Sequence, residues 1–309
     1  MFDNLDYLTQ LDESAKARPC VLDNVERSLL CRTVYLGYDL FECPDCGKET
    51  IIPHSCHSRF CNSCGVKYAK QLAAKALTSC LDITHRHIVF TIPKELRIVF
   101  KANRSLLDLL FVATRNTIAA ITNPSFYKIS KKLNLKNTHY LYKNYSHANH
   151  FGMIATLHTF GRALNWTLHI HCLVAEIVYD KDKDQLKKFH HFNFEKLRKI
   201  FQYELLRLLE EALGPSFKPL KSQIYKDHPK GFYVYARYKK DEDDEYSMKE
   251  NSKNINACVS YCMRYASRPA MAENRIIEYN KEEGYVRWYY DDHKTNERQI
   301  CKRQRERFY

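Results

Sequence analysis

Two histidines flank a single isoleucine, His169-Ile170-His171, inside an apolar run from Leu168 to Val174. In an extended strand successive side chains alternate between the two faces, so residues two apart project the same way. The run therefore predicts a strand that buries Ile170 and turns both imidazoles toward one point on the other face. Two neutral imidazoles side by side supply half of a metal site. Two ordinary strand histidines are the alternative reading.

A metal held by this pair needs at least one further protein ligand. His158 lies on the strand expected before the pair, and His87 lies on an earlier strand, so either could complete the set. Glu176 and Gln202 are poorer candidates. A divalent ion held this way polarises a phosphoryl oxygen and orients it for attack. Such a reaction needs a nucleophile from elsewhere in the chain.

The chain is long and basic. Its 309 residues suffice for two domains, and a hydrophobic share of 45% excludes a disordered chain. The 49 Lys and Arg exceed the 36 Asp and Glu, which favours DNA, RNA or acidic lipid as a partner. A basic surface that serves only solubility would show the same surplus. We find no membrane span and no signal peptide, and expect a reducing cytoplasm, where cysteines act as metal ligands or core residues.

Two C-x2-C pairs, Cys43 with Cys46 and Cys61 with Cys64, stand fourteen residues apart. Each pair lets two thiolates reach one ion from a tight turn, and two pairs complete a tetrahedral zinc shell. Four thiolates leave no open coordination position, so the expected Zn2+ is structural. Other potential ligands lie nearby: Cys31, His54, Cys56 and His57. Among these, Cys56 is the first candidate to replace a member of the pairs.

Hydrophobic periodicity and the Gly and Pro breaks predict an α+β chain. The expected helices are 1–30 (broken near Pro19), 66–80, 101–120, 194–213 and 255–267. The expected strands are 85–92, 152–160, 169–178, 231–238, 273–279 and 285–290. Residues 152–160 and 169–178 should form a β-hairpin, and residues 123–150 a loop. We expect a zinc-binding domain over 1–80 and a larger sheet domain over 81–309.

Tyr261 and Tyr265 stand four residues apart in the predicted helix 255–267, so their side chains share one face. An apolar stripe lies roughly opposite that face and should meet the core: Ile255, Val259, Met263 and Ala266. A phenol, with a pKa of about 10, is a weak nucleophile until a base, a cation or a metal-bound substrate helps it. Taken alone, the pair could be two ordinary exposed tyrosines. The second such pair, Tyr285 and Tyr289, falls in a strand-like run and is expected to be structural.

The order of these motifs resembles that of the two-tyrosine HUH transposases of rolling-circle insertion sequences. The similarity runs through nearly the whole chain. Residues 31–64 are similar to the family's zinc-binding segment, 87–97 to its first strand, 157–174 to its histidine hairpin and 261–276 to its tyrosine helix.

This resemblance implies a small Cys-rich zinc-binding domain followed by an HUH endonuclease domain with a central antiparallel sheet flanked by helices. A Mg2+ or Mn2+ ion on His169 and His171, with His158 as the favoured third ligand, would hold the scissile phosphate of single-stranded DNA. Tyr261 or Tyr265 would attack it and leave a 5′-phosphotyrosine link and a free 3′-hydroxyl. The implied protein is a transposase that acts on the ends of a mobile element and on its target, in the cytoplasm at the nucleoid.

The chain departs from the family pattern at two places. Leu168 stands where the family often has a Pro before the first histidine. The sequence also closes on the basic run 302–307 without a terminating element, where family members commonly continue. We therefore expect a shortened copy or a fragment.

Cations and aromatic side chains that suit single-stranded DNA accompany these motifs. The expected DNA contacts are Arg59, Arg162, Trp166, Arg264 and Arg268. Residues 127–143 and 232–240 also mix rings with Lys and Arg, although a solvated loop and an ordinary strand would look the same. Two other functions remain open: an HUH replication initiator or relaxase with the same chemistry, and a decayed transposase that only binds DNA through its zinc domain. The C-x2-C pairs favour the transposase over the initiator or relaxase.

Overall fold

The fold is taken from a computed structural model, which describes residues 19–304 with internal gaps. The gaps are 125–127, 129–148, 162, 190–191, 237–254, 268–269 and 293–294. The chain divides into two compact units, one formed by Met1–Leu72 with Ser267–Tyr309 and the other by Ala73–Ala266. The expected domains were 1–80 and 81–309. They stay a prediction, because a compact unit is not necessarily a part that folds separately.

An antiparallel sheet forms the centre of the unit Ala73–Ala266. Its strands are β3 (His85–Thr91), β4 (Asn149–Phe160), β5 (Trp166–Asp180) and β7 (Val234–Ala236), in the order β4-β5-β3-β7. A short strand, β6 (Gln185–Lys188), pairs with the end of β5. β4 and β5 form the expected hairpin around the histidine motif. β5 lies between β4 and β3, and its side chains from Ile170 to Glu176 are buried on both faces of the sheet.

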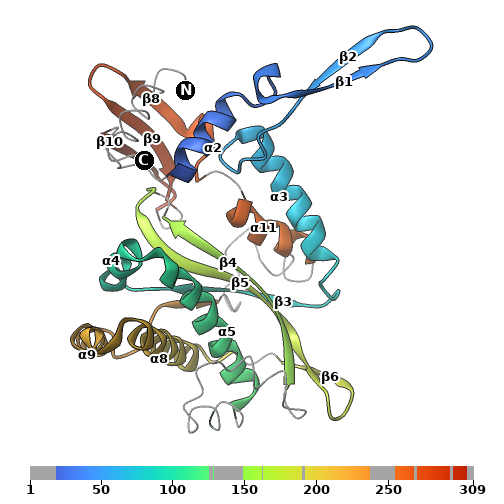
Figure 1. The fold of residues 1–309 in the computed structure, drawn as a ribbon. Helices are drawn as coiled ribbons and strands as arrows, with labels where there is room; N and C mark the ends of the chain where they lie inside the picture. The colour runs from blue at the N-terminus through green and yellow to red at the C-terminus, as the bar shows by residue number, and fades with distance from the viewer. Residues whose placement is uncertain are drawn as a thin grey trace. The chain divides into compact units, whose positions relative to one another are not determined.

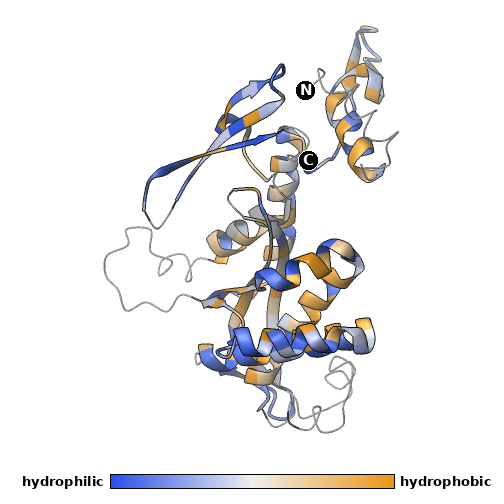
Figure 2. Ribbon diagram, turned by 90° about the vertical axis from the view of Figure 1, so that its left-hand side faces the viewer, coloured by the Kyte–Doolittle hydropathy of each residue, from blue (hydrophilic) through white to orange (hydrophobic). Residues whose placement is uncertain are grey.

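Helices cover the two sides of this sheet unequally. α4 (Lys94–Ala102), α5 (Asp108–Thr122), α8 (Phe194–Leu213) and α9 (Lys218–Asp227) lie on one side of β4 and β5, and α11 (Ile255–Ser267) lies on the other (Figure 1). The helices at the base of this unit alternate hydrophilic and hydrophobic residues along their length (Figure 2), as expected for helices with one buried face. Short 3-10 turns, Arg104–Leu107 and Gly214–Phe217, link successive helices.

The core lies between the sheet and the helices α4, α5 and α8. Leu168, Ile170 and Cys172 point into it from β5, and each is completely buried. Phe90 of β3 meets Phe201 of α8 with ring centroids 4.9 Å apart. The apolar side chains of β5 thus alternate with its histidines, as the sequence predicts.

The helix α8 forms over the predicted range, Phe194–Leu213, because both of its ends carry specific signals. The side chain of Asn193 accepts a hydrogen bond from the backbone N–H of Lys196, which satisfies one of the otherwise unpaired donors of the first turn. At the other end Gly214 adopts φ +74°, a left-handed conformation that favours glycine.

The stretch Arg104–Thr122 has the length and apolar composition of a membrane span, and no other described helix does. Its apolar window is 56% buried within the protein. Asn116 of α5 donates a hydrogen bond of 2.8 Å to the buried carboxylate of Glu204 in α8. The stretch is therefore a core helix packed against α8.

The other unit combines an N-terminal and a C-terminal part. The first contains α2 (Pro19–Leu29), the hairpin β1 (Tyr38–Glu42) and β2 (Glu49–Pro53), and α3 (Asn62–Leu77), which continues past the unit boundary. The second is an antiparallel sheet in the order β10-β9-β8, with β8 (Ile276–Asn280), β9 (Tyr285–Asp291) and β10 (Arg298–Gln304). Trp288 of β9 is buried.

The predicted α+β class, with a Cys-rich N-terminal region and an antiparallel sheet domain, is confirmed. Several elements differ from the prediction. The single helix expected over 101–120 is divided at Asn103, whose side chain accepts a hydrogen bond from Ser105 N and starts a new turn. The expected strand 231–238 is described only over β7. The elements α4, α9, β1, β2, β6 and β10 were not expected. Residues 1–18 and most of the expected loop 123–150 lie outside the described residues.

Phe90→Ala should destabilise the unit by about 3–5 kcal/mol, because it removes a ring that is completely buried between β3 and α8. Ile98→Ala is the matched control, since Ile98 is 71% exposed on α4 and its loss should change stability by about 0.5 kcal/mol or less. Urea denaturation of both variants measures the difference. Equal losses would contradict the described core.

Candidate metal centres and tyrosine helix

Three histidines meet on one face of the central sheet. His158 of β4 stands directly opposite His169 of β5, and Thr156 stands opposite His171. Residues directly opposite in an antiparallel pair point to the same face, and so do residues two apart in one strand. The register of β4 and β5 therefore places all three imidazoles together, on the face away from the helical core.

The nitrogens of these rings are close enough to share one ion. One nitrogen from each of His158, His169 and His171 lies within 4.8 Å of the others. His158 Nδ1 is 2.9 Å from His169 Nε2. His169 Nδ1 donates a hydrogen bond of 3.2 Å to the backbone oxygen of Thr167, which leaves Nε2 with its lone pair. The structure thus brings the predicted trio together.

Burial keeps His169 and His171 in the neutral form that binds metals. It lowers the pKa of His171 to about 2, with further lowering by the neighbouring His87, His169 and His158. Burial also lowers the pKa of His169, and Arg97 of α4 adds to the effect. Near neutral pH the rings of His169 and His171 consequently carry free lone pairs rather than charge. Three imidazoles with neutral nitrogens of this kind fit a divalent cation.

His87 lies beside the trio but outside it. Its Nε2 is 2.9 Å from Nδ1 of His171, and the two rings stack with centroids 5.2 Å apart. Burial lowers the pKa of His87 to about 4. Of the two candidates for a third ligand, His158 joins the cluster, whereas His87 contacts Nδ1 of His171 and is not part of the group.

The two poorer candidates for a third ligand lie elsewhere. Glu176 is on the helical side of the sheet, where it forms a buried ion pair with Arg86. Gln202 of α8 donates a hydrogen bond of 3.0 Å to the backbone oxygen of His228. Neither side chain belongs to the histidine group.

The start of β5 is fastened to α4 near these histidines. The indole N–H of Trp166 donates a hydrogen bond of 3.1 Å to the backbone oxygen of Arg97. The guanidinium of Arg104 lies over the Trp166 ring at 4.8 Å from its centroid. Trp166 was predicted as a DNA contact, and the structure places it as a partly buried packing residue with an exposed cation above it. Arg162 lies outside the described residues.

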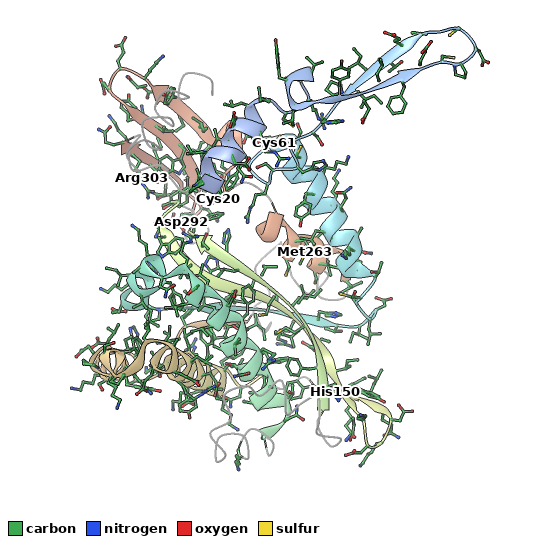
Figure 3. All side chains as sticks on the ribbon, viewed as in Figure 1. Cys20, Cys61, His150, Met263, Asp292 and Arg303 are labelled. Atoms are coloured by element: carbon green, nitrogen blue, oxygen red, sulfur yellow. The ribbon has the colours of Figure 1, made fainter. Side chains whose placement is uncertain are left out.

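α11 carries the predicted tyrosines on the sheet side that holds the histidines (Figure 1). Val259, Cys262 and Met263 are buried on this helix, and Met263 is labelled in Figure 3. Burial raises the pKa of the Cys172 thiol in β5, and the nearby Cys262 thiol raises it further. The turn that includes Cys262 therefore lies near β5. The side chains of Tyr261, Arg264 and Tyr265, and all of Arg268, lie outside the described residues.

Four thiols form a second potential metal site. Cys31 follows α2, Cys56 follows β2, and Cys61 and Cys64 border the first turn of α3. Their sulfurs lie within 4.8 Å of one another, with 3.6 Å between Cys31 and Cys64 and 3.8 Å between Cys31 and Cys61. Figure 3 labels Cys61 at the start of α3.

The thiols of this cluster differ in acidity. Burial raises the pKa of Cys31 to about 12. Cys64 is also buried, yet hydrogen bonds to its sulfur from Cys31, the backbone of His57 and the other two thiols lower its pKa to about 7. Four sulfurs from short, closely spaced turns fit the tetrahedral shell of a structural Zn2+.

The structure does not bring the four predicted zinc ligands together, and this corrects the sequence analysis. Cys61 and Cys64 join Cys31 and Cys56, whereas Cys43 and Cys46 lie at the tip of the β1–β2 hairpin. The reason is that β1 and β2 pair over their whole length, from Tyr38 opposite Pro53 to Glu42 opposite Glu49, which holds the first pair at the far end. The prediction followed the regular C-x2-C spacing. It therefore gave less weight to Cys31 and Cys56, which stand outside both pairs in the sequence.

The remaining predicted residues of this region stay outside the cluster. His54 Nε2 lies 3.1 Å from a carboxylate oxygen of Asp39, and His57 Nε2 lies 3.4 Å from the hydroxyl of Ser55. Arg59, predicted to contact DNA, is exposed between Cys56 and Cys61.

Comparison with known proteins identifies the family of this chain. Residues 4–92 match a family model described as "Transposase zinc-binding domain", and residues 152–309, more than half of the chain, match one described as "Putative transposase". The chain belongs to this transposase family. The first match accords with the Cys-rich N-terminal region and its four-thiol cluster.

Two curated relatives extend this similarity. The transposase of insertion sequence element IS801 from Pseudomonas savastanoi pv. phaseolicola is 27% identical over 291 residues, which cover 92% of this chain and 63% of the relative. The protein y4qJ of Sinorhizobium fredii, named a putative transposase, is 25% identical over 308 residues, covering 95% of this chain and 71% of the relative. The chain thus spans less than two thirds of the length of the IS801 transposase. No solved structure is significantly similar.

Cys56→Ser should remove about one zinc ion per chain and lower the melting temperature of the zinc-binding region, because three thiolates hold structural zinc poorly and the region depends on it. Cys80→Ser is the control, since the Cys80 thiol only hydrogen-bonds to the backbone oxygen of Ala76. Metal analysis with and without a chelator measures both. Full zinc content in Cys56→Ser would contradict this cluster.

Proposed function

We propose that this family member nicks and rejoins single-stranded DNA through a 5′-phosphotyrosine intermediate in rolling-circle-type transposition. The observation that carries the proposal is the pairing of His158 with His169 on the sheet face toward α11. The histidine group and α11, the helix that carries Tyr261 and Tyr265 in its sequence, then lie on the same side of the sheet. This shared side supports the proposal of a tyrosine nuclease.

His158, His169 and His171 would hold the catalytic ion. When bound, a divalent ion supplies Lewis-acid polarisation of a phosphoryl oxygen. The three nitrogen donors favour Mn2+ over Mg2+, because Mg2+ prefers carboxylates and waters. The fixed Nδ1–H of His169 and the contact of His171 with His87 orient both rings before substrate arrives.

Tyr261 and Tyr265 would act as nucleophiles. The phenolic oxygen forms a bond to phosphorus while the bond to the 3′-oxygen breaks, and the phenol's proton ends on the released 3′-hydroxyl. The second tyrosine permits another cleavage before the first link is resolved. The covalent link conserves the phosphodiester, so no external energy source is needed.

Basic side chains would guide the DNA to this site. The predicted contacts Arg59, Arg162, Arg264 and Arg268 remain part of the proposal. Arg104, the cation that lies over the Trp166 ring, is added to them. Arg97 extends the set, because it lies close enough to His169 to lower the pKa of that ring. The net charge of +13 supports a polyanionic partner whose binding weakens with salt. The proposed substrates are the ends of a mobile element and its target, and the proposed location is the nucleoid.

Two other functions use the same features. A replication initiator or relaxase would perform identical chemistry on other DNA, but the transposase zinc-binding domain favours transposition. A decayed protein that only binds DNA would keep the zinc cluster and lose the nuclease.

The tyrosines can be tested by adduct formation. Wild type with Mn2+ and a single-stranded oligonucleotide should form a covalent DNA–protein adduct, and Tyr261→Phe with Tyr265→Phe should abolish it by removing both phenolic oxygens. Tyr289→Phe is the control from the second Tyr-x3-Tyr pair and should keep it. Denaturing gel electrophoresis measures the adduct. Unchanged adducts in the double variant would overturn the proposed nucleophiles, and none in wild type would leave the DNA-binding alternative.

His87 provides an independent test of the metal site. His87→Leu should weaken Mn2+ binding by about 10–100-fold, because Nδ1 of His171 loses the partner that holds its ring. His87→Gln should keep most of the affinity, since its amide oxygen can accept from the same nitrogen. Calorimetric titration with Mn2+ compares the two variants. Equal affinity of His87→Leu and wild type would contradict this role.

A further inference from the structure

The β1–β2 hairpin is exposed along its whole length. It extends away from α2 and α3 (Figure 1), and its side chains stand clear on both sides (Figure 3). Leu40 and Ile51, opposite each other on one face, are 53% and 51% exposed, and Phe41 and Ile52 on the other face are 56% and 52% exposed. An isolated two-stranded hairpin is marginally stable in water, and apolar exposure of this kind marks an interaction site.

The tip of this hairpin holds two thiols in a preformed turn. Cys43 N donates to Lys48 O, and Gly47 N donates to Cys43 O at 2.9 Å, with Gly47 at φ +65°. The backbone N–H groups of Asp45 and Cys46 and the Cys46 thiol hydrogen-bond to the sulfur of Cys43. The turn therefore holds two sulfurs side by side, which is half of a tetrahedral zinc shell.

In the unit that contains the hairpin, no described side chain joins Cys43 and Cys46 to make a group of three ligands. Among described residues, the two groups with three or more metal-binding side chains are the histidine trio and the Cys31 cluster, and neither includes Cys43 or Cys46. Five paired residues on each strand place the tip roughly 16 Å from the hairpin base. The Cys31 cluster already supplies four sulfurs of its own.

The charge of the hairpin selects a cation rather than DNA. Residues 38–53 contain Asp39, Glu42, Asp45 and Glu49 against the single cation Lys48, in a chain with a net charge of +13. An acidic tip repels phosphates and attracts a divalent metal ion.

We propose that the hairpin tips of two copies of this chain share one Zn2+ through Cys43 and Cys46 of each copy. A two-fold axis through the ion supplies four thiolates from one repeated half-site and closes the assembly at a dimer. The exposed apolar side chains along both hairpins lie next to this junction. The dimer is independent of the nuclease proposed above, because it uses neither the histidines nor the tyrosines.

Metal content and mass of the full chain, measured together in a non-metal-binding reductant, test the junction. Wild type should be a dimer with about 1.5 zinc ions per chain, one ion in each Cys31 cluster and one shared. Cys43→Ser with Cys46→Ser should be a monomer with about one ion per chain and an unchanged circular dichroism spectrum. Cys20→Ser, an exposed cysteine outside both groups, should behave as wild type.

Several results would overturn the shared ion: a monomeric wild type, a dimer that persists in the double serine variant, or a monomer with two zinc ions per chain. Cobalt titration of metal-free wild type adds a test that needs no variant. The tetrathiolate absorption should grow in two phases that together take up about 1.5 equivalents, and the phase that changes the mass should account for about half an equivalent. A single phase without dimer formation would equally exclude the junction.

Discussion

The antiparallel register between β4 and β5 is the constraint on which the candidate site depends. It sets His158 opposite His169 and leaves His171 two residues further along the same face. A shift by one residue would send His158 to the helical side and bury it among apolar side chains. Leu168, Ile170 and Cys172 stabilise this register, because burying their apolar side chains is favourable only when they face the core. The histidines that alternate with them then face the other way. The same alternation in β5 thus places the core residues on one face of the sheet and the histidines on the other.

The two candidate metal sites lie in different structural settings. In the sheet unit three imidazoles gather on one face of strands whose other face packs against an apolar core. In the N-terminal region the Cys31 cluster gathers the end of α2, the return from β2 and the start of α3, which share few buried apolar residues. The first arrangement suits chemistry on a bound substrate, and the second suits structural zinc.

Segments with a regular hydrophobic period were predictable from the sequence. Contacts between residues far apart in the chain were not. The strand His85–Thr91, the hairpin β4–β5 and the helix Phe194–Leu213 follow from alternation, helical period and the Gly214 stop. Asn103, which divides the expected helix 101–120, is a local capping signal that the apolar period concealed. The zinc partners were harder, because nothing in the local pattern shows that β1 and β2 pair fully and hold Cys43 and Cys46 away from Cys61. Only the tertiary path brings Cys31 and Cys56 together.

The central claim is that a metal on the histidine face and a phenol of α11 meet at one phosphate. A crystal structure of the Tyr261→Phe, Tyr265→Phe variant with Mn2+ and a single-stranded oligonucleotide tests it most directly, because anomalous scattering locates the manganese. The account predicts an ion bound to His158, His169 and His171 and to a phosphate oxygen, with ring 261 or 265 facing that phosphorus. Manganese bound elsewhere, or both rings turned away from the histidine face, would contradict it.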